Sequence, residues 1–355
     1  LEANTSGRNN VAVGMDALTV CTTGDDNTAM GASALALMTT ASDNSAFGSG
    51  SLARTTTGAN NVAMGWMSLL NNTTASSNTA VGSSALTANT TGAQNVAVGN
   101  NTLAANTTGS LNVAMGHIAL DANTTGTENV AIGTYALSSS TTAGTNTAIG
   151  HYALYDNTDG TKNVGVGWRA AYQQTTPSHN TAVGYQALQG TTTGGENTAI
   201  GAFAMAANTT AANNTAVGKS AGTAVTTGAS NTYLGAEAGE GNTTHSYNTG
   251  IGFRALEANH SSSDGFNTAL GSEAGKTITG SYNTFLGARS GDATTSGDYT
   301  TAVGADAYGA VGTGSSNTAI GNRALYVNTS GADNVAVGRL ALGLNTTGGE
   351  NVAVG

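Results

Sequence analysis

A five-residue motif, Asn-(Thr/Val)-Ala-(apolar)-Gly, recurs at every seventeenth position along this chain of 355 residues. It begins at Asn10 and keeps the 17-residue step to Asn248. A 19-residue step and a 16-residue step then lead to Asn267 and Asn283, after which the regular step resumes at Thr300 and gives 21 copies in all. A fixed period of this length is typical of a solenoid, in which each repeat packs only against its neighbours.

The residue types within one repeat predict short strands joined by turns. We number the positions of each coil from 1 to 17, starting at the first residue of the motif. Apolar or β-branched residues at positions 2 and 4 predict a strand with both side chains on one face, and Ala at position 3 points to the other face. The invariant Gly at position 5 predicts a tight bend that requires positive φ or a close approach of the backbone. Ala-Leu at positions 8 and 9 predicts a second extended segment, and Asn-Thr-Thr-Gly at positions 12 to 15 predicts a turn whose Gly adopts the αL conformation.

These expectations define the fold class. We predict an all-β protein, a parallel β-solenoid of about 21 coils in which each coil comprises strand, bend, strand and turn. Glycine recurs too often for a helical repeat, and the apolar residues show no period of 3.6. Because no change in composition marks a boundary, residues 1–355 are expected to form a single repeat domain that is irregular at about 248–300. The chain begins and ends within a repeat, so we expect it to be part of a longer fibre.

Charged residues test this frame, because they are almost never buried without a partner. Only 8% of the residues are charged, and they fall at positions 6, 7, 10, 11, 14, 16 and 17. The other positions are therefore expected to form the interior or an interface between subunits. Positions 4 and 9 supply most of the large apolar side chains, which is a thin core for one chain and favours sharing of apolar faces between chains. The net charge of −10 disfavours nucleic acid as a partner. No apolar run in the sequence is long enough to span a membrane, so we expect no membrane contact within this segment.

The Asn column at position 1 is the most uniform polar feature of the repeat. Asn occupies this position in 20 of the 21 copies, with Thr300 as the exception. Asn side chains stacked coil upon coil form amide ladders, so we predict an inward or half-buried ladder with a local break at Thr300. Over the regular part of the chain the predicted ladder comprises Asn10, Asn27, Asn44, Asn61, Asn78, Asn95, Asn112, Asn129, Asn146, Asn163, Asn180, Asn197, Asn214, Asn231 and Asn248.

The motif Asn-Thr-Ala-Val-Gly-x-x-Ala, found at Asn78, resembles the head repeats of trimeric autotransporter adhesins. The longer pattern with Ala-Leu and Asn-Thr-Thr-Gly is similar to repeats of bacteriophage tail fibres and related surface fibres. The resemblance covers the whole chain and implies a left-handed parallel β-roll that assembles as a homotrimer. The 17-residue coil of this chain is longer than that of the adhesin heads, and its strand motif is one residue shorter, so the cross-section differs from theirs.

No motif in the sequence indicates an enzyme. The chain has no catalytic Ser elbow, phosphate-binding loop or paired catalytic carboxylates, and its five histidines fall at four different coil positions. We therefore predict no catalytic, cofactor-binding or metal site and no cofactor. Aromatic residues at position 6 are the candidate surface contacts, with packing between coils or subunits as the alternative interpretation. These candidates are Trp66, Trp168, Tyr185 and Phe253.

The predicted function is that of a structural shaft or head in an extracellular adhesive fibre, which projects a binding tip and itself contacts surfaces or glycans. Its predicted partners are further copies of the same chain, in a homotrimer or filament, and a host-cell surface or its glycans. The first alternative is the shaft of a bacteriophage tail fibre, which places the chain on a virion. The second is a glycan-binding module that uses the exposed aromatic residues. Regular Thr columns are also found in ice-binding surfaces, which makes ice binding a third alternative.

Overall fold

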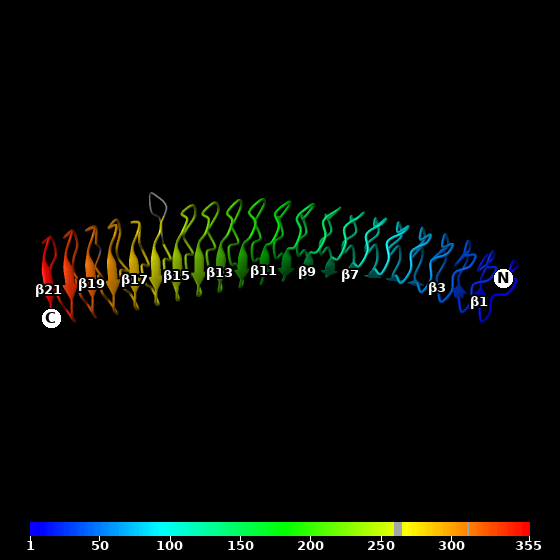
Figure 1. Ribbon diagram of the computed structural model, residues 1–355, viewed down its shortest axis with the longest axis horizontal. Helices are drawn as coiled ribbons and strands as arrows, with labels where there is room; N and C mark the ends of the chain where they lie inside the picture. The colour runs from blue at the N-terminus through cyan, green and yellow to red at the C-terminus, as the bar shows by residue number, and fades with distance from the viewer. Residues whose placement is uncertain (259–264, 311) are drawn as a thin grey trace. The chain divides into compact units, whose positions relative to one another are not determined.

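The computed structural model describes residues 1–258, 265–310 and 312–355, and these residues form 21 three-residue strands and no helix. The chain comprises two compact units, Leu1–His179 and Asn180–Gly355. In both units each coil contributes one strand, and successive strands lie side by side along the stack (Figure 1). The fold is therefore an all-β parallel β-solenoid, and its strands recur with the 17-residue period that the motif predicts.

The N-terminal unit contains ten strands in one parallel ladder. Each strand pairs with that of the next coil, so that Val11 of the first lies opposite Thr28 of the second. The strands are β1 (Val11–Val13), β2 (Thr28–Met30), β3 (Ser45–Phe47), β4 (Val62–Met64), β5 (Thr79–Val81), β6 (Val96–Val98), β7 (Val113–Met115), β8 (Val130–Ile132), β9 (Thr147–Ile149) and β10 (Val164–Val166).

The C-terminal unit repeats this arrangement with eleven strands. They are β11 (Thr181–Val183), β12 (Thr198–Ile200), β13 (Thr215–Val217), β14 (Thr232–Leu234), β15 (Thr249–Ile251), β16 (Thr268–Leu270), β17 (Thr284–Leu286), β18 (Thr301–Val303), β19 (Thr318–Ile320), β20 (Val335–Val337) and β21 (Val352–Val354). Thr249 lies opposite Thr268, and Thr268 lies opposite Thr284, so the irregular steps leave the strand register intact. The longer step includes residues 259–264, which lie outside the described residues.

The strand turns its small side chain inward and its large one outward. Ala at position 3, such as Ala80, is fully buried, and so is Leu at position 9, such as Leu86. Position 4 is different, because Met64 is 44% exposed and the same is true of most of the larger residues in this column. The expectation that position 4 contributes to the core of the chain is therefore wrong. The narrow interior is filled by Leu at position 9, which leaves room only for Ala across from it.

The segment around Ala-Leu is not the second strand that the sequence predicts. Positions 6 to 11 form consecutive turns in every regular coil. Two residues of this segment, at positions 7 and 9, have positive φ, as Ser84 (56°) and Leu86 (54°) show. Alternating αL residues prevent an extended strand, and they fold the chain back so that the buried Leu faces the strand.

The turn after Asn-Thr-Thr also differs from its prediction. Gly92 at position 15 does not have a positive φ. The αL residue of this turn is instead at position 17, as Gln94 shows with a φ of 59°. Position 17 is often Asn, Asp or Ser, and Asn and Asp tolerate this conformation better than most residues. Gly92 instead permits close approach, since a Cβ there would lie 2.2 Å from the carbonyl oxygen of Gly109 in the next coil.

The invariant Gly at position 5 has both a positive φ and no space for a side chain. Gly99 has a φ of +137°, and a Cβ at this residue would lie 2.5 Å from the carbonyl oxygen of Gly116. L-residues rarely adopt this backbone conformation, and the next coil stacks directly on it. These two constraints explain why the position is Gly in all 21 copies.

In two coils the large core residue is at position 3 and the small one at position 9, the reverse of the regular coil. Tyr233 and Phe285 replace the small residue at position 3 and are nevertheless buried. In the same coils position 9 is Gly239 and Gly291 instead of Leu, and a Cβ at either glycine would lie within about 2.5 Å of the aromatic ring. The interior thus keeps its filled volume because a large residue at position 3 is matched by glycine at position 9.

Candidate functional site

The Asn column at position 1 forms a continuous ladder within the N-terminal unit. Asn95 is fully buried, and its backbone N–H donates to Oδ1 of Asn78 at 2.9 Å. Its Nδ2 donates to the carbonyl oxygen of Gly109 at 2.9 Å, and its Oδ1 accepts from the backbone N–H of Asn112 at 3.0 Å. Each carboxamide therefore links its own coil to both neighbours and satisfies buried backbone groups. The same backbone-to-Oδ1 bond joins Asn197, Asn214, Asn231 and Asn248 in the C-terminal unit.

Thr300 changes this ladder at one rung. Its backbone N–H still donates to Oδ1 of Asn283 at 2.8 Å, but its hydroxyl donates to the carbonyl oxygen of Asp298 at 3.4 Å. Threonine has no carboxamide to present to Asn317 in the next coil. The buried Tyr308, which belongs to the same coil as Thr300, instead accepts a hydrogen bond at its hydroxyl from Nδ2 of Asn317 at 3.3 Å. Tyr308 thus supplies a polar partner beside the altered rung.

A second amide column lies at position 12, where the sequence indicated only a turn. Nδ2 of Asn89 donates to Oδ1 of Asn72 at 3.0 Å, and Asn106 and Asn123 continue the series at 2.9 and 2.8 Å. All four side chains are fully buried. All four also begin Asn-x-Ser/Thr sequences, and their burial removes them from reach of glycosylation in the folded chain. The recurrence of Asn at position 12 of successive coils is the sequence signal that indicates this second ladder.

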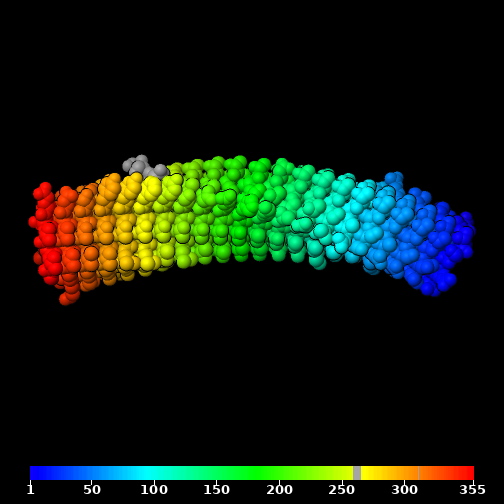
Figure 2. All heavy atoms as spheres, in the orientation of Figure 1, coloured from blue at the N-terminus to red at the C-terminus, as the bar shows by residue number. Residues whose placement is uncertain are grey.

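The outward face of each strand carries positions 2 and 4 and contains no charged residue. Val or Thr at position 2 is mostly half-buried, whereas larger residues at position 4 are more exposed. In Figure 2 the side chains of successive coils in each unit lie in rows along the stack. The most exposed position-4 residues of the N-terminal unit are Val13, Met30, Met64, Met115, Ile132 and Ile149. We call positions 2 and 4 together the outward strand face.

The candidate surface aromatic residues do not converge on one site. Trp66 and Trp168 belong to the same column of the N-terminal unit but are six coils apart, which separates them by roughly 30 Å. Trp66 is 54% exposed, while Trp168 is half-buried. In the C-terminal unit, Tyr185 packs edge-on against Phe203 with ring centroids 5.2 Å apart, and Phe253 lies under a neighbouring arginine.

Aromatic residues do gather on three successive coils of the N-terminal unit. Tyr135 and Tyr152 stack with centroids 5.2 Å apart, and Tyr155 and Tyr172 stack with centroids 5.4 Å apart. The two pairs meet edge-on between Tyr152 and Tyr155, at 5.2 Å. The guanidinium of Arg169 lies 5.0 Å from the ring centre of Tyr172. We call these four tyrosines with Trp168 and Arg169 the aromatic cluster. Burial, followed by the negative charges of neighbouring phenols and Asp156, raises the pKa of the Tyr155 hydroxyl.

A second set of aromatic rings occupies position 17, or the equivalent position in the irregular coils, in the C-terminal unit. Tyr247, Phe266, Tyr282 and Tyr299 directly precede four successive motifs and are 40–62% exposed. Their rings stack in sequence at 4.7, 5.0 and 5.1 Å with interplanar angles of 3–11°. The irregular 19-residue and 16-residue steps fall between these rings, so the change in coil length is absorbed before the aromatic residue.

Charges of alternating sign occupy position 7 along the same part of the C-terminal unit. Arg254 bonds to Glu237 at 2.6 Å, and Arg289 bonds to Asp306 at 2.8 Å. Three carboxylates, of Glu237, Glu240 and Glu257, have oxygen atoms within 4.8 Å of one another. Burial, followed by the charges of the other two, raises the pKa of Glu240. Arg254 also lies 3.8 Å from Glu257, so this acidic group already has a cationic partner.

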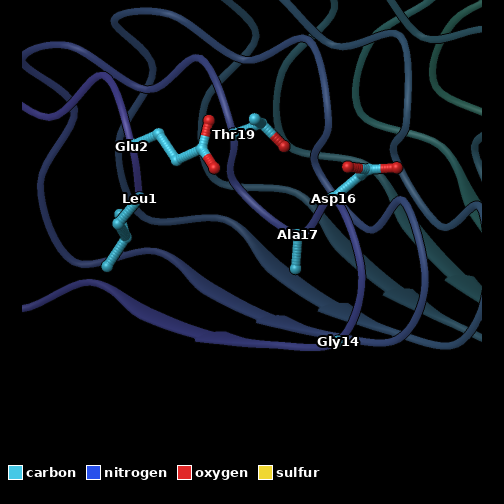
Figure 3. Close-up of a pocket in the computed structure, with 6 residues that line it drawn as sticks. All are labelled: Leu1, Glu2, Gly14, Asp16, Ala17 and Thr19. Atoms are coloured by element: carbon cyan, nitrogen blue, oxygen red, sulfur yellow. The ribbon is translucent and has the colours of Figure 1, made fainter.

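The first coil carries a recess of about 150 Å³ lined by Leu1, Glu2, Gly14, Asp16, Ala17 and Thr19. Figure 3 shows the carboxylates of Glu2 and Asp16 at its rim. The recess is open and mostly polar, with nothing in it that indicates a ligand class. Cys21, the lone cysteine, is buried and free in the following turn.

Fold and surface together define a parallel β-solenoid repeat protein whose interior is held by amide ladders. No protein-family model matches the chain, and a comparison with curated proteins finds no match. Among the residues that the structure describes, no helix is long and apolar enough to cross a membrane.

Proposed function

We propose that this chain is the shaft or head of an extracellular adhesive fibre, assembled as a homotrimer of left-handed β-rolls like the heads of trimeric autotransporter adhesins. The observation that carries the proposal is the outward strand face, in which position 4 is apolar in every coil and position 2 is an uncharged column of Val, Thr and Ser. Solvent-exposed sheet faces normally carry polar or charged side chains. A long apolar column that stays exposed in the single chain indicates a face covered by another copy.

The exposed area of this face can be compared with that of known interfaces. A large aliphatic side chain that is about two-fifths exposed leaves roughly 70 Å² open, so the six most exposed position-4 residues of the N-terminal unit offer on the order of 400 Å², about half of the roughly 800 Å² per partner of a standard interface, and the half-buried residues of positions 2 and 4 add further area. In-register coils would place the columns of neighbouring chains in continuous contact. The assembled fibre would be stiff because every coil is hydrogen-bonded to the next, and it would present many identical surface sites at once.

Equilibrium sedimentation of the full chain tests the assembly. We expect the mass of a trimer for the unmodified protein. Combined replacement of Met30, Met64 and Met115 by Glu places charges on the outward strand face and is expected to shift the mass to that of a monomer. Met15→Glu is the matched control, because Met15 is even more exposed but lies at position 6, outside this face. A monomeric unmodified chain would refute the trimer.

Two related functions remain as alternatives. The shaft of a bacteriophage tail fibre would have the same fold and assembly, and the sequence that flanks this segment in its parent protein distinguishes the two: a membrane anchor indicates an adhesin, and a baseplate or chaperone segment indicates a tail fibre. A glycan-binding module would depend on the exposed aromatic residues. Glycan-array binding by Trp66→Ala and Trp168→Ala variants tests this, and unchanged binding by both variants would eliminate these two residues as its contacts.

A further inference from the structure

Arg169 is held by aromatic rings rather than by acidic side chains. Its guanidinium carbon lies 4.4 Å from the ring centre of Trp168, 5.0 Å from that of Tyr172 and 5.8 Å from that of Tyr152. Cation–π contacts with three rings fix the position of the guanidinium and exclude water from one side of it. Its Nε is buried and has no hydrogen-bond partner. A buried guanidinium nitrogen without a partner is costly, and in a native protein it calls for an explanation.

The other arginines that contact rings show what is missing at Arg169. Arg254 lies 4.9 Å from the ring of Phe253 and also pairs with Glu237 at 2.6 Å. Arg323 lies 5.3 Å from the ring of Tyr326 and also lies 3.7 Å from a carboxylate oxygen of Asp306. Among the described residues no carboxylate forms an ion pair with Arg169, although the chain has twice as many acidic as basic residues. Arg169 therefore keeps its capacity to bind an anion.

The neighbouring rings determine what kind of anion fits. The aromatic cluster offers several half-buried phenol and indole surfaces within one or two coils of Arg169. Apolar faces of sugar rings pack on such surfaces, and the phenol hydroxyls can donate to sugar oxygens. The planar fork of a guanidinium matches the paired oxygens of a carboxylate or sulfate. His151, whose ring lies 4.0 Å from that of Tyr152, adds a further polar group at the edge of the cluster.

We propose that the aromatic cluster binds an acidic saccharide, a sugar unit that carries a carboxylate or a sulfate group. Arg169 pairs with the anionic group, while Trp168 and Tyr172 support the adjacent sugar ring. The inference rests on the proposal that the fibre contacts glycans, and it names the class of glycan and the residues that select it. Because the site lies within a single chain, each copy in an assembled fibre would carry one, and weak individual binding would be strengthened by multivalency.

Binding of matched trisaccharide and disaccharide probes to the full chain tests the site. Titration calorimetry with sialyllactose, sulfated lactose and neutral lactose separates the two anionic groups from the sugar alone. We expect at least one acidic probe to bind roughly tenfold more tightly than lactose, as a charge-assisted pair would provide. Arg169→Gln should abolish this preference, so that acidic and neutral probes bind this variant equally. Arg323→Gln is the matched control, since it removes an arginine that contacts a ring but already has a carboxylate partner, and it should retain the preference.

Equal binding of acidic and neutral probes by the unmodified chain would overturn the proposal, as would an Arg169→Gln variant that keeps the preference. Arg169→Lys adds a second criterion, because lysine keeps the charge but not the planar fork and should retain only part of the preference. The thermal unfolding midpoint of each variant verifies that the coils remain folded. Sedimentation reports on assembly independently, so a monomer that discriminates acidic probes refutes the fibre but not this site.

Discussion

Removing one rung of the Asn ladder should open the solenoid locally, and Asn95→Ala is the variant that we develop. The substitution deletes an Oδ1 that accepts from the backbone N–H of Asn112 at 3.0 Å and an Nδ2 that donates to the carbonyl oxygen of Gly109 at 2.9 Å. The Asn112 N–H would stay in the interior without a partner, whereas the Gly109 carbonyl keeps the bond from Nδ2 of Asn106 at 2.9 Å. An orphaned buried group costs about 1–3 kcal/mol and the lost bond to Gly109 about 1 kcal/mol, so the expected loss is roughly 3 kcal/mol, to which a small cavity adds.

Hydrogen exchange is the appropriate assay, because a solenoid opens in segments and has no single unfolding free energy. We expect amides of β7 (Val113–Met115), in the coil after the missing rung, to exchange about a hundredfold faster than in the unmodified chain, since each 1.4 kcal/mol corresponds to a factor of ten. Amides several coils away should be unaffected. Asn100→Ala is the matched control in the same coil, because Asn100 is exposed and makes only a 3.4 Å bond to a backbone carbonyl.

The result that would refute this reasoning is exchange in β7 that changes by less than threefold in Asn95→Ala, or by the same factor in Asn100→Ala. Either outcome would mean that the ladder amides do not stabilise the stack beyond their backbone pairing. Asn95→Thr provides an intermediate test. It reproduces the natural residue at Thr300, where a hydroxyl replaces the carboxamide, but it lacks the compensating tyrosine that lies beside that rung.

Three further predictions concern other parts of the chain. Gly99→Ala should cost about 3 kcal/mol or more in denaturant unfolding, because φ is +137° and the new Cβ would lie 2.5 Å from the next coil, whereas Gly50→Ala, with its nearest neighbour at 3.5 Å, should cost about 1 kcal/mol. Burial raises the pKa of Tyr233 above its ordinary value near 10, so stability is intact below about pH 10. Above that pH the unfolded chain loses this proton first, so the free energy of unfolding should fall by up to about 1.4 kcal/mol per pH unit. Tyr233→Phe should reduce this slope, and urea midpoints measured from about pH 9 to about pH 11 give the comparison. Arg254→Glu brings like charges together beside Glu237, and its lowered thermal midpoint should recover partly in high salt.

The features that the sequence predicted well are those that depend on a single column of the repeat. The period and its phase follow from the recurrence of the motif, and a polar residue as regular as Asn at position 1 is explained by a ladder between coils. The invariant Gly at position 5 indicated positive φ or a close approach of the backbone, and the structure shows both, with φ between +125° and +142° at this position. These properties are local to one residue and its equivalents above and below, so composition in a column is enough to infer them.

Features that depend on two columns facing each other required the tertiary structure. Alternation along the strand gives two faces but does not say which is inside, and the interior proved too narrow to hold both Leu at position 9 and a large residue at position 4. The paired exchange of Tyr233 with Gly239 is visible only when both are seen across the same core. The gathering of Arg169 with three rings likewise depends on how turns bring positions 6, 7 and 10 together. Sequence thus specified the repeat, whereas packing across the coil decided what lies inside and what is left on the surface, because the space available to a side chain is set by its opposite neighbours.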